Sequence, residues 1–195
     1  MGSVGTKLIY LAIGLPYGAI VTPTSGAPRC NLRRGGKFVQ MPLQVYELWH
    51  QALDGIDRDA LREIAARNND LDDFDDNLAW FMSSQLLLPW TQQEADLEHF
   101  ARIRVIPCGI GAGNSAEHPE AFALLARHDA APALWVDVVA FTLYGHFDGI
   151  ATLDEACATT AKRLDYPVDE VRGRALTLLP LLMRAGLVFI DLTVR

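Results

Sequence analysis

The feature that most constrains the fold of this sequence is an internal repeat. The segment KLIYLAIGLPYG (residues 7–18) aligns with RIRVIPCGIGAG (residues 102–113) at a shift of 95 residues. The same shift aligns VYELW with AFTLY, a shift of 94 residues aligns LDGI with FDGI, and the later segments follow in the same order. Such self-similarity indicates that one structural unit occurs twice. We therefore predict two repeats, residues 1–96 and 97–195.

Each half has the same predicted order of strands. Short runs that alternate or stay apolar, separated by Gly, Pro and Asn, are typical of β-hairpins. The run 121–127 fits a helix equally well, and its partner in the first half favours a strand. A final apolar strand closes each half. The predicted strands are 7–13, 27–33, 37–41 and 86–90 in the first half, and 102–107, 121–127, 133–137 and 187–191 in the second.

Three helices are predicted between the third and the closing strand of each half. In the first half they cover residues 43–53, 58–68 and 74–85. Apolar residues spaced as on one helical face predict the buried sides. These residues are Val45, Leu48, Trp49 and Ala52 in the first helix, and Phe74, Leu78, Phe81 and Met82 in the third, where Gln85 shares the same face. Trp49 aligns with Tyr144, and both are expected in the core.

Local signals place several helix boundaries. Asp57 is a predicted N-cap of the second helix, and Thr152 with Glu155 predicts a capping box at the equivalent helix of the second half. Pro180 is expected to interrupt the last helix, because proline lacks the N–H that an interior position donates. The polar segment 91–100 is predicted to be a helical connector.

Strands, three helices and a terminal strand describe a winged helix-turn-helix. The predicted fold class is α+β, with two tandem winged helix-turn-helix repeats, each with a small antiparallel β-sheet preceding three helices. A helix, a DG turn and a second helix occur in LWHQALDGIDRDALREIAARNN and in LYGHFDGIATLDEACATTAKRL. This pattern resembles the PqqD-like winged helices, which are leader-peptide recognition elements of pathways for ribosomally made, modified peptides. The resemblance covers each half.

The resemblance implies a non-catalytic binding module. In that family a peptide adds as a strand beside the third β-strand and lies against the third helix, a mode of β-augmentation. The partner is then a peptide or protein, such as a precursor or leader peptide or a partner enzyme. The positions that match the family's groove are Lys37, Val39, Met41, Asn77, Trp80, Ser84, Leu134, Val136, Arg172 and Arg174.

The sequence allows two alternative environments for each of two tryptophans. Trp80 lies off the apolar stripe of its helix, so it is expected either to face the groove or to pack against the other repeat. Trp135 alternates with its neighbours in a strand and is expected to face the groove or an interface.

DNA binding is the alternative function, because most winged helices insert their third helix into a major groove. In that case the chain is a transcription regulator whose duplication replaces a homodimer. The second half offers Arg172, Arg174 and Arg184 for this purpose. The first half carries an acidic cluster at the start of the helix, which repels phosphates and otherwise is a solvated helix start favoured by the helix dipole. The cluster consists of Asp70, Asp72, Asp73, Asp75 and Asp76.

The net negative charge of the chain argues against two further classes of partner. The net charge of −7 and the pI near 5.1 weigh against broad binding to nucleic acid or to anionic membranes. The N-terminal segment lacks the basic start and cleavage site of a signal peptide, so a cytoplasmic protein with no membrane partner is expected. Cys30, Cys108 and Cys157 are expected to be reduced thiols that are mostly buried.

No cofactor, metal site or catalysis is predicted. The histidines at positions 50, 99, 118, 128 and 146 form no spaced pair typical of metal ligands or a proton relay. A Cys108 nucleophile beside His118 is a minor alternative. The spacing GxGxG at residues 109–113 lacks the GK[ST] of a phosphate loop. Because the first half keeps Gly14 and Gly18 at the equivalent places, a turn that requires positive φ is predicted instead.

Overall fold

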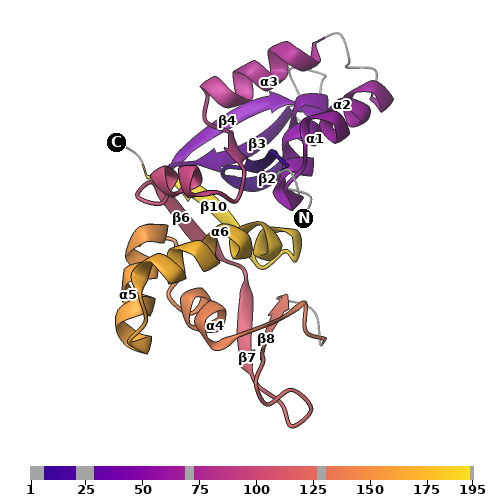
Figure 1. Cartoon of the computed structure of the whole chain (residues 1–195). Coiled ribbons are helices and arrows are strands. Elements are labelled where there is room, and N and C mark those ends of the chain that lie inside the picture. The colour runs from indigo at the N-terminus through magenta and orange to yellow at the C-terminus, as the bar shows by residue number, and fades with distance from the viewer. Residues whose placement is uncertain (1–6, 21–28, 69–72, 127–130, 194–195) are drawn as a thin grey trace, which may run out of the picture. The chain divides into compact units, whose positions relative to one another are not determined.

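A computed structural model describes residues 7–20, 29–68, 73–126 and 131–193 (Figure 1). Its class is α+β, with small antiparallel sheets. The contacts divide the chain into two compact units, which we call the first unit (Met1–Thr91) and the second unit (Gln92–Thr193). Each is described by itself below.

The first unit contains two antiparallel sheets. Its three-stranded sheet has the order β2-β3-β4, and a two-stranded sheet pairs β1 with β5, so the first and last strands of the unit close it. The elements are β1 (Ile9–Ala12), β2 (Leu15–Ile20), β3 (Arg29–Arg34), β4 (Lys37–Pro42), α1 (Leu43–Gln51), η1 (Ala52–Asp54), α2 (Arg58–Arg67), α3 (Phe74–Ser83) and β5 (Leu87–Trp90).

The second unit has the same kinds of pairing. Its sheets are β7-β8-β9 and β6 with β10, again antiparallel. The predicted connector is a 3₁₀ helix. The elements are η2 (Glu94–His99), β6 (Ile103–Pro107), β7 (Gly109–Gly113), β8 (Phe122–Ala126), β9 (Leu134–Val136), α4 (Val138–Tyr144), α5 (Leu153–Leu164), α6 (Val168–Arg184) and β10 (Val188–Leu192).

The glycine segments are mostly strands, and the predicted need for positive φ is confirmed at three of the four aligned glycines. Gly14, at the bend between β1 and β2, has a φ of +112°. β2 shifts register between Pro16 and Gly18, and β7 shifts register between Gly111 and Gly113. Gly18 and Gly113 both have φ near +80°, so a bulge takes the place of a turn. The bulges lie 95 residues apart, at equivalent places of the repeat.

Position 109 requires glycine because of close packing and not because of a positive φ angle. Its φ is not positive, but a Cβ atom there would lie 2.5 Å from the Leu125 carbonyl oxygen and 2.9 Å from the Tyr144 hydroxyl. Only glycine therefore lets β7 approach its neighbours this closely. No helix occurs between residues 114 and 126, which directly follow this strand, so the strand–loop–helix geometry of a phosphate loop is absent there.

The helix boundaries follow the local signals. The Asp57 carboxylate accepts a hydrogen bond from the Ala60 backbone N–H at 2.9 Å and caps α2. Lys7 contacts the same carboxylate, and this contact lowers the pKa of Asp57. At α5, Thr152 and Glu155 form the predicted capping box. These caps satisfy backbone donors that the first helical turn leaves unpaired.

Helix α6 continues through Pro180, so the predicted interruption is wrong. Pro180 is buried, and the residues around it bury an apolar face on both sides of the proline. The burial of a side chain such as Leu179 or Leu182 contributes about 2 kcal/mol, and several such residues offset one missing backbone hydrogen bond.

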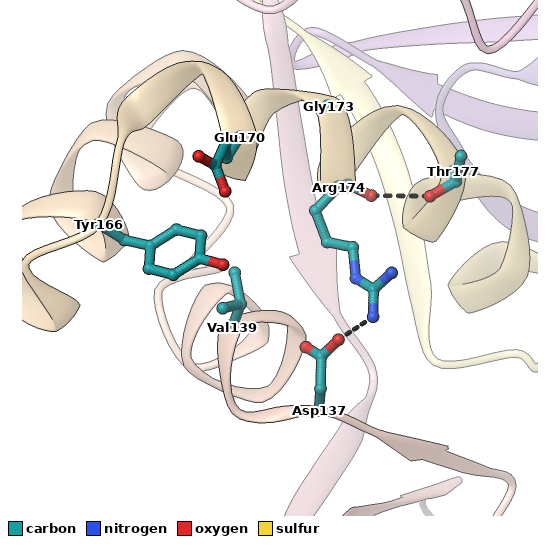
Figure 2. Close-up of a pocket in the computed structure, with 7 residues that line it drawn as sticks. All are labelled: Asp137, Val139, Tyr166, Glu170, Gly173, Arg174 and Thr177. Carbon is teal, nitrogen blue, oxygen red and sulfur yellow. Dashed lines mark hydrogen bonds and ion pairs between the residues drawn. The ribbon is translucent and has the colours of Figure 1, made fainter.

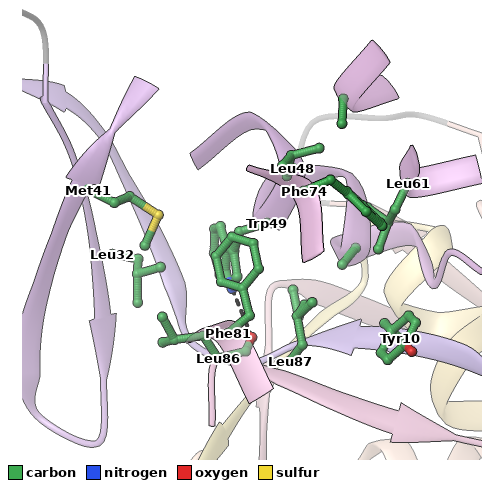
Figure 3. Close-up of a cluster of buried hydrophobic side chains, with 13 residues drawn as sticks. Tyr10, Leu32, Met41, Leu48, Trp49, Leu61, Phe74, Phe81, Leu86 and Leu87 are labelled. Carbon is green, nitrogen blue, oxygen red and sulfur yellow. Dashed lines mark hydrogen bonds between the residues drawn. The ribbon is translucent and has the colours of Figure 1, made fainter. Parts of the chain in front are cut away.

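The core of the first unit is built around Trp49 (Figure 3). This side chain is fully buried, and its indole N–H donates a hydrogen bond to the Leu86 carbonyl oxygen at 3.0 Å. Phe81 from α3 is also buried in this cluster, while Leu78 and Met82 pack against it. The apolar faces predicted for the first and third helices therefore both contribute to the core.

Tyr144 holds the equivalent place in the second unit. Its hydroxyl donates to the Leu187 carbonyl oxygen at 3.3 Å and accepts from the Gly109 backbone N–H at 3.1 Å. Leu187, like Leu86, directly precedes the closing strand of its unit. The predicted structural roles of Trp49 and Tyr144 are confirmed, because both side chains are buried.

The buried phenol of Tyr144 is expected to make the stability of the protein depend on pH. Burial raises the pKa of Tyr144 from its ordinary value near 10 to about 12. The unfolded chain therefore loses the phenol proton first, and stability falls as the pH rises from the unfolded value toward the folded one. At neutral pH, we expect Tyr144→Phe to cost about 1 kcal/mol for the lost hydrogen bonds. Urea unfolding against pH should show this difference shrinking in alkali, whereas parallel curves would contradict the assignment.

Candidate functional site

The strand β9 is an edge strand of the second unit. It pairs with β8 and ends the sheet order β7-β8-β9 in the described part of the chain. An edge strand directs N–H and C=O groups of alternate residues away from its sheet, where they can pair with another extended chain. The backbone of Leu134–Val136 therefore offers a template for one further strand.

Helix α6 presents one continuous face beside this strand. Residues spaced by three or four positions lie on one side of a helix. The residues of this face that line the cavities are Glu170, Gly173, Arg174, Thr177, Leu178 and Leu181, of which Leu178 is also buried in the core. The buried face of the same helix consists of Val171, Ala175, Leu179 and Leu182.

The strand and the helix line a shared cavity. A cavity of about 220 Å³ has β9 on one side and Arg174, Thr177, Leu178 and Leu181 on the other. A second cavity of about 520 Å³ shares Asp137, Arg174 and Thr177 with the first and extends toward Tyr166 (Figure 2). Because they share three residues, we treat both as one groove and call it the β9–α6 groove.

An ion pair crosses the middle of the groove. Arg174 extends from α6 to the Asp137 carboxylate (Figure 2). The other oxygen of Asp137 accepts a hydrogen bond from the Ala140 backbone N–H at 2.9 Å and caps α4. Both side chains of the pair are partly exposed, so a charged ligand can compete with it.

Exposed apolar side chains lie along both ends of the groove. Trp135 is 37% exposed, Tyr166 is 44% exposed and Leu181 is 47% exposed. The His118 ring packs on Trp135, with 4.4 Å between the ring centroids. Surface aromatic and aliphatic side chains gathered at one groove are typical of a binding site.

Gly173 leaves the wall of the groove open. No atom lies within 4 Å of the place where a Cβ atom at this position would be. The helical backbone therefore borders the larger cavity directly. A methyl group added at position 173 would therefore meet no atom outside its own helix backbone and chain neighbours.

Of the site residues predicted in the second unit, three line the groove and one does not. Leu134, Val136 and Arg174 line the groove. Arg172 does not, because its guanidinium binds the Asp154 carboxylate at 2.7 Å and the Asp169 carboxylate at 3.1 Å.

Sequence reasoning missed some residues of the groove. Continuing the helical spacing from Arg174 would have found Leu178 and Leu181. Tyr166 precedes the helix, and only the tertiary structure brings it to the groove.

The predicted site residues of the first unit lie in different environments. Lys37 and Trp80 are exposed, whereas Asn77 and Ser84 are half-buried. Met41 is only 1% exposed and belongs to the core cluster, and Val39 packs against that cluster. The Met41 side chain is thus held inside the unit.

The acidic cluster is described only in part. Asp70 and Asp72 lie outside the described residues. Asp73, Asp75 and Asp76 are exposed, and Asp75 binds Arg58 at 2.6 Å.

The surroundings of the three cysteine thiols favour structural roles for them. Cys30 and Cys157 are buried and free, and burial raises the pKa of the Cys157 thiol to about 12, which leaves little thiolate at neutral pH. The Cys108 thiol lies 3.5 Å from the Gly186 carbonyl oxygen. His118, its proposed partner, packs on Trp135 instead.

His128 lies outside the described residues. In the described ranges, no three His, Cys, Asp or Glu side chains gather closely enough to hold a metal ion.

In the described part of the chain, no helix has the length and apolar character that a membrane span requires. Comparison with models of protein families, with curated protein sequences and with solved structures finds no match for this chain.

Proposed function

We propose that this chain is a non-catalytic adaptor that binds a polypeptide segment in the β9–α6 groove. In this proposal the chain consists of two PqqD-like winged-helix repeats, residues 1–96 and 97–195, and the second carries the working groove. The observation that supports it most strongly is the cavity lined jointly by the edge strand β9 and by α6. Such a groove can hold one extended segment between its walls.

The groove chemistry favours a particular kind of peptide. Backbone groups of β9 would pair with the added strand, and alternate side chains would point toward α6. An apolar side chain fits beside Leu178 and Leu181, and an acidic side chain could contact Arg174 in place of Asp137. The proposed ligand is therefore an extended segment with an apolar anchor next to an acidic residue.

The DNA-binding alternative has weaker support from the same helices. A recognition helix needs arginines that are free to contact bases or phosphates. Arg172 binds two carboxylates, so its charge is compensated within the unit, and of these two arginines only Arg174, whose pair with Asp137 is partly exposed, could exchange its partner for a phosphate. In α3 the exposed Asp75 and Asp76 lie in the first turn of the helix and would repel the phosphate backbone. Specific retardation of duplex DNA by the full chain would favour the alternative.

The peptide proposal predicts that a large residue at position 173 weakens binding. Random peptides displayed on phage are selected against the full chain, and the affinity of the selected peptide is measured by calorimetry. We expect Gly173→Trp to weaken binding at least about tenfold, because the indole fills the space that the ligand needs. We expect Arg174→Ala to weaken peptides that carry an acidic residue more than peptides in which that residue is Gln.

Gly173→Ala is the matched control. A methyl group occupies little of the cavity, and alanine favours the helix relative to glycine by up to about 1 kcal/mol. This variant should bind the selected peptide nearly as well as the original chain. Equal affinity of the original chain and of Gly173→Trp for every selected peptide would contradict the proposal.

A further inference from the structure

Basic residues are concentrated at the start of the chain. Residues 1–46 contain five basic residues and no Asp or Glu, although the whole chain has a net charge of −7. All 24 acidic residues therefore come later in the sequence. Four of the five basic residues, Arg29, Arg33, Arg34 and Lys37, belong to the β3–β4 hairpin.

The three-stranded sheet of the first unit has one buried face and one open face. The cross-strand pairs Cys30 with Met41 and Leu32 with Val39 point toward the core. Successive side chains of a strand point to opposite faces. The pair Arg33 with Phe38 therefore lies on the other face.

Two aromatic rings stand on this open face. Tyr17, the bulged residue of β2, packs edge to face on Phe38 with 5.2 Å between the ring centroids. Tyr17 is 54% exposed and Phe38 is 64% exposed. Among the described residues, Phe38 is one of the most exposed large apolar side chains, and exposed apolar groups gathered on one surface are typical of an interaction site.

The basic groups around these rings are available for a ligand. Arg29 and Arg33 alternate onto the open face and make no ion pair with any residue that the structure describes. Arg34 and Lys37 pair with each other across the hairpin on the opposite face. Arg34 donates a hydrogen bond to Gln85, which is a neutral partner. The open face thus combines exposed rings with positive charge that the protein itself does not neutralise.

We propose that the open face of the β2-β3-β4 sheet binds single-stranded nucleic acid. Unpaired bases can stack on Tyr17 and Phe38, while Arg29 and Arg33 contact the phosphates. A duplex hides its bases from such a platform, so single strands are favoured. This site lies in the first unit and is independent of the β9–α6 groove.

Binding of fluorescein-labelled oligouridylate and oligothymidylate, measured by fluorescence anisotropy, tests the proposal. We expect the full chain to bind at least one of the two strands more tightly than a duplex of equal length. Tyr17→Ala and Phe38→Ala should each weaken binding about tenfold. Arg29→Gln, at an exposed position of the open face, should reduce the slope of log affinity against log salt by about 0.7. Tyr166→Ala, an exposed tyrosine of the second unit, is the control and should bind as the original chain does.

The two strands distinguish the source of the ligand. Tighter binding of oligouridylate than of oligothymidylate assigns the site to RNA, and the reverse order assigns it to DNA. Polyglutamate tests whether charge alone is enough. The proposal is overturned if polyglutamate competes as well as the oligonucleotides, if neither aromatic variant weakens binding, or if no binding occurs at low salt.

Discussion

Trp49→Ala is expected to lower the free energy of unfolding by about 3–5 kcal/mol. The indole is fully buried among Leu48, Phe81 and Leu86, and its removal leaves a cavity that the surrounding helices and strands can fill only in part. The substitution also deprives the Leu86 carbonyl oxygen of its indole donor. Stabilities of small domains lie in the range of about 5–15 kcal/mol, so the first unit should be close to unfolding. Urea unfolding followed by circular dichroism measures the loss.

Two further variants separate packing from hydrogen bonding. Trp49→Phe keeps most of the buried area but loses the donor, and should cost about 1–3 kcal/mol. Trp80→Ala removes an indole that is 38% exposed on α3 and should cost less than either. If Trp80→Ala proved as harmful as Trp49→Ala, the assignment of Trp49 as the centre of the core would be wrong.

Gly14→Ala is the second substitution with a large expected effect. The φ angle of Gly14 is +112°, a conformation that residues with a side chain rarely adopt, and the strain costs about 1–3 kcal/mol. A Cβ atom there would also lie 2.7 Å from the Arg33 carbonyl oxygen, which is backbone and cannot turn away. We expect a total loss of several kcal/mol. Because β1 and β2 meet at this residue, both sheets of the first unit should be disturbed.

The control for Gly14→Ala is the same substitution at Gly173. That glycine lies inside α6 with open space around it, so alanine should leave stability unchanged or increase it slightly. Unfolding curves of the two variants measured side by side provide the comparison. Equal stability of Gly14→Ala and the original chain would show that the described backbone at Gly14 is incorrect.

Periodicity in the sequence predicted most of the elements correctly. The apolar spacing around Trp49 and Phe81 identified helices and their buried faces, because a helix must bury one stripe of side chains. The caps at Asp57 and Thr152 followed from local hydrogen bonding, which needs no tertiary contact. The strand at 121–127 was ambiguous by pattern, and its repeat partner gave the right answer.

The glycine-containing strands could not be predicted in this way. Gly109–Gly113 has few side chains to alternate, so the period that identifies a strand is absent. Its pairing depends on close approach to β8 and Tyr144, which are distant in sequence. The continuation of α6 through Pro180 likewise depends on tertiary burial that outweighs a local rule.

The candidate groove was predicted in its outline and missed in its detail. The segments of β9 and α6 that line the cavity came from the resemblance to a known family, and Leu134, Val136 and Arg174 do line it. Met41 was expected in the equivalent groove of the first unit, yet its side chain lies in the core. A strand residue is assigned to the wrong face whenever the pattern does not fix which face is buried.

Hydrogen exchange of the backbone amides in β9 tests the central claim most directly. The full chain is compared by mass spectrometry with and without a peptide selected against it. Gly173→Trp, in which binding is weakened, serves as the control at a peptide concentration that occupies the original chain but not the variant. If the peptide adds as a strand in the β9–α6 groove, exchange in the segment Leu134–Val136 should slow at least about tenfold in the original chain and stay unchanged in the variant. A peptide that binds tightly yet leaves exchange in β9 unchanged would contradict the account.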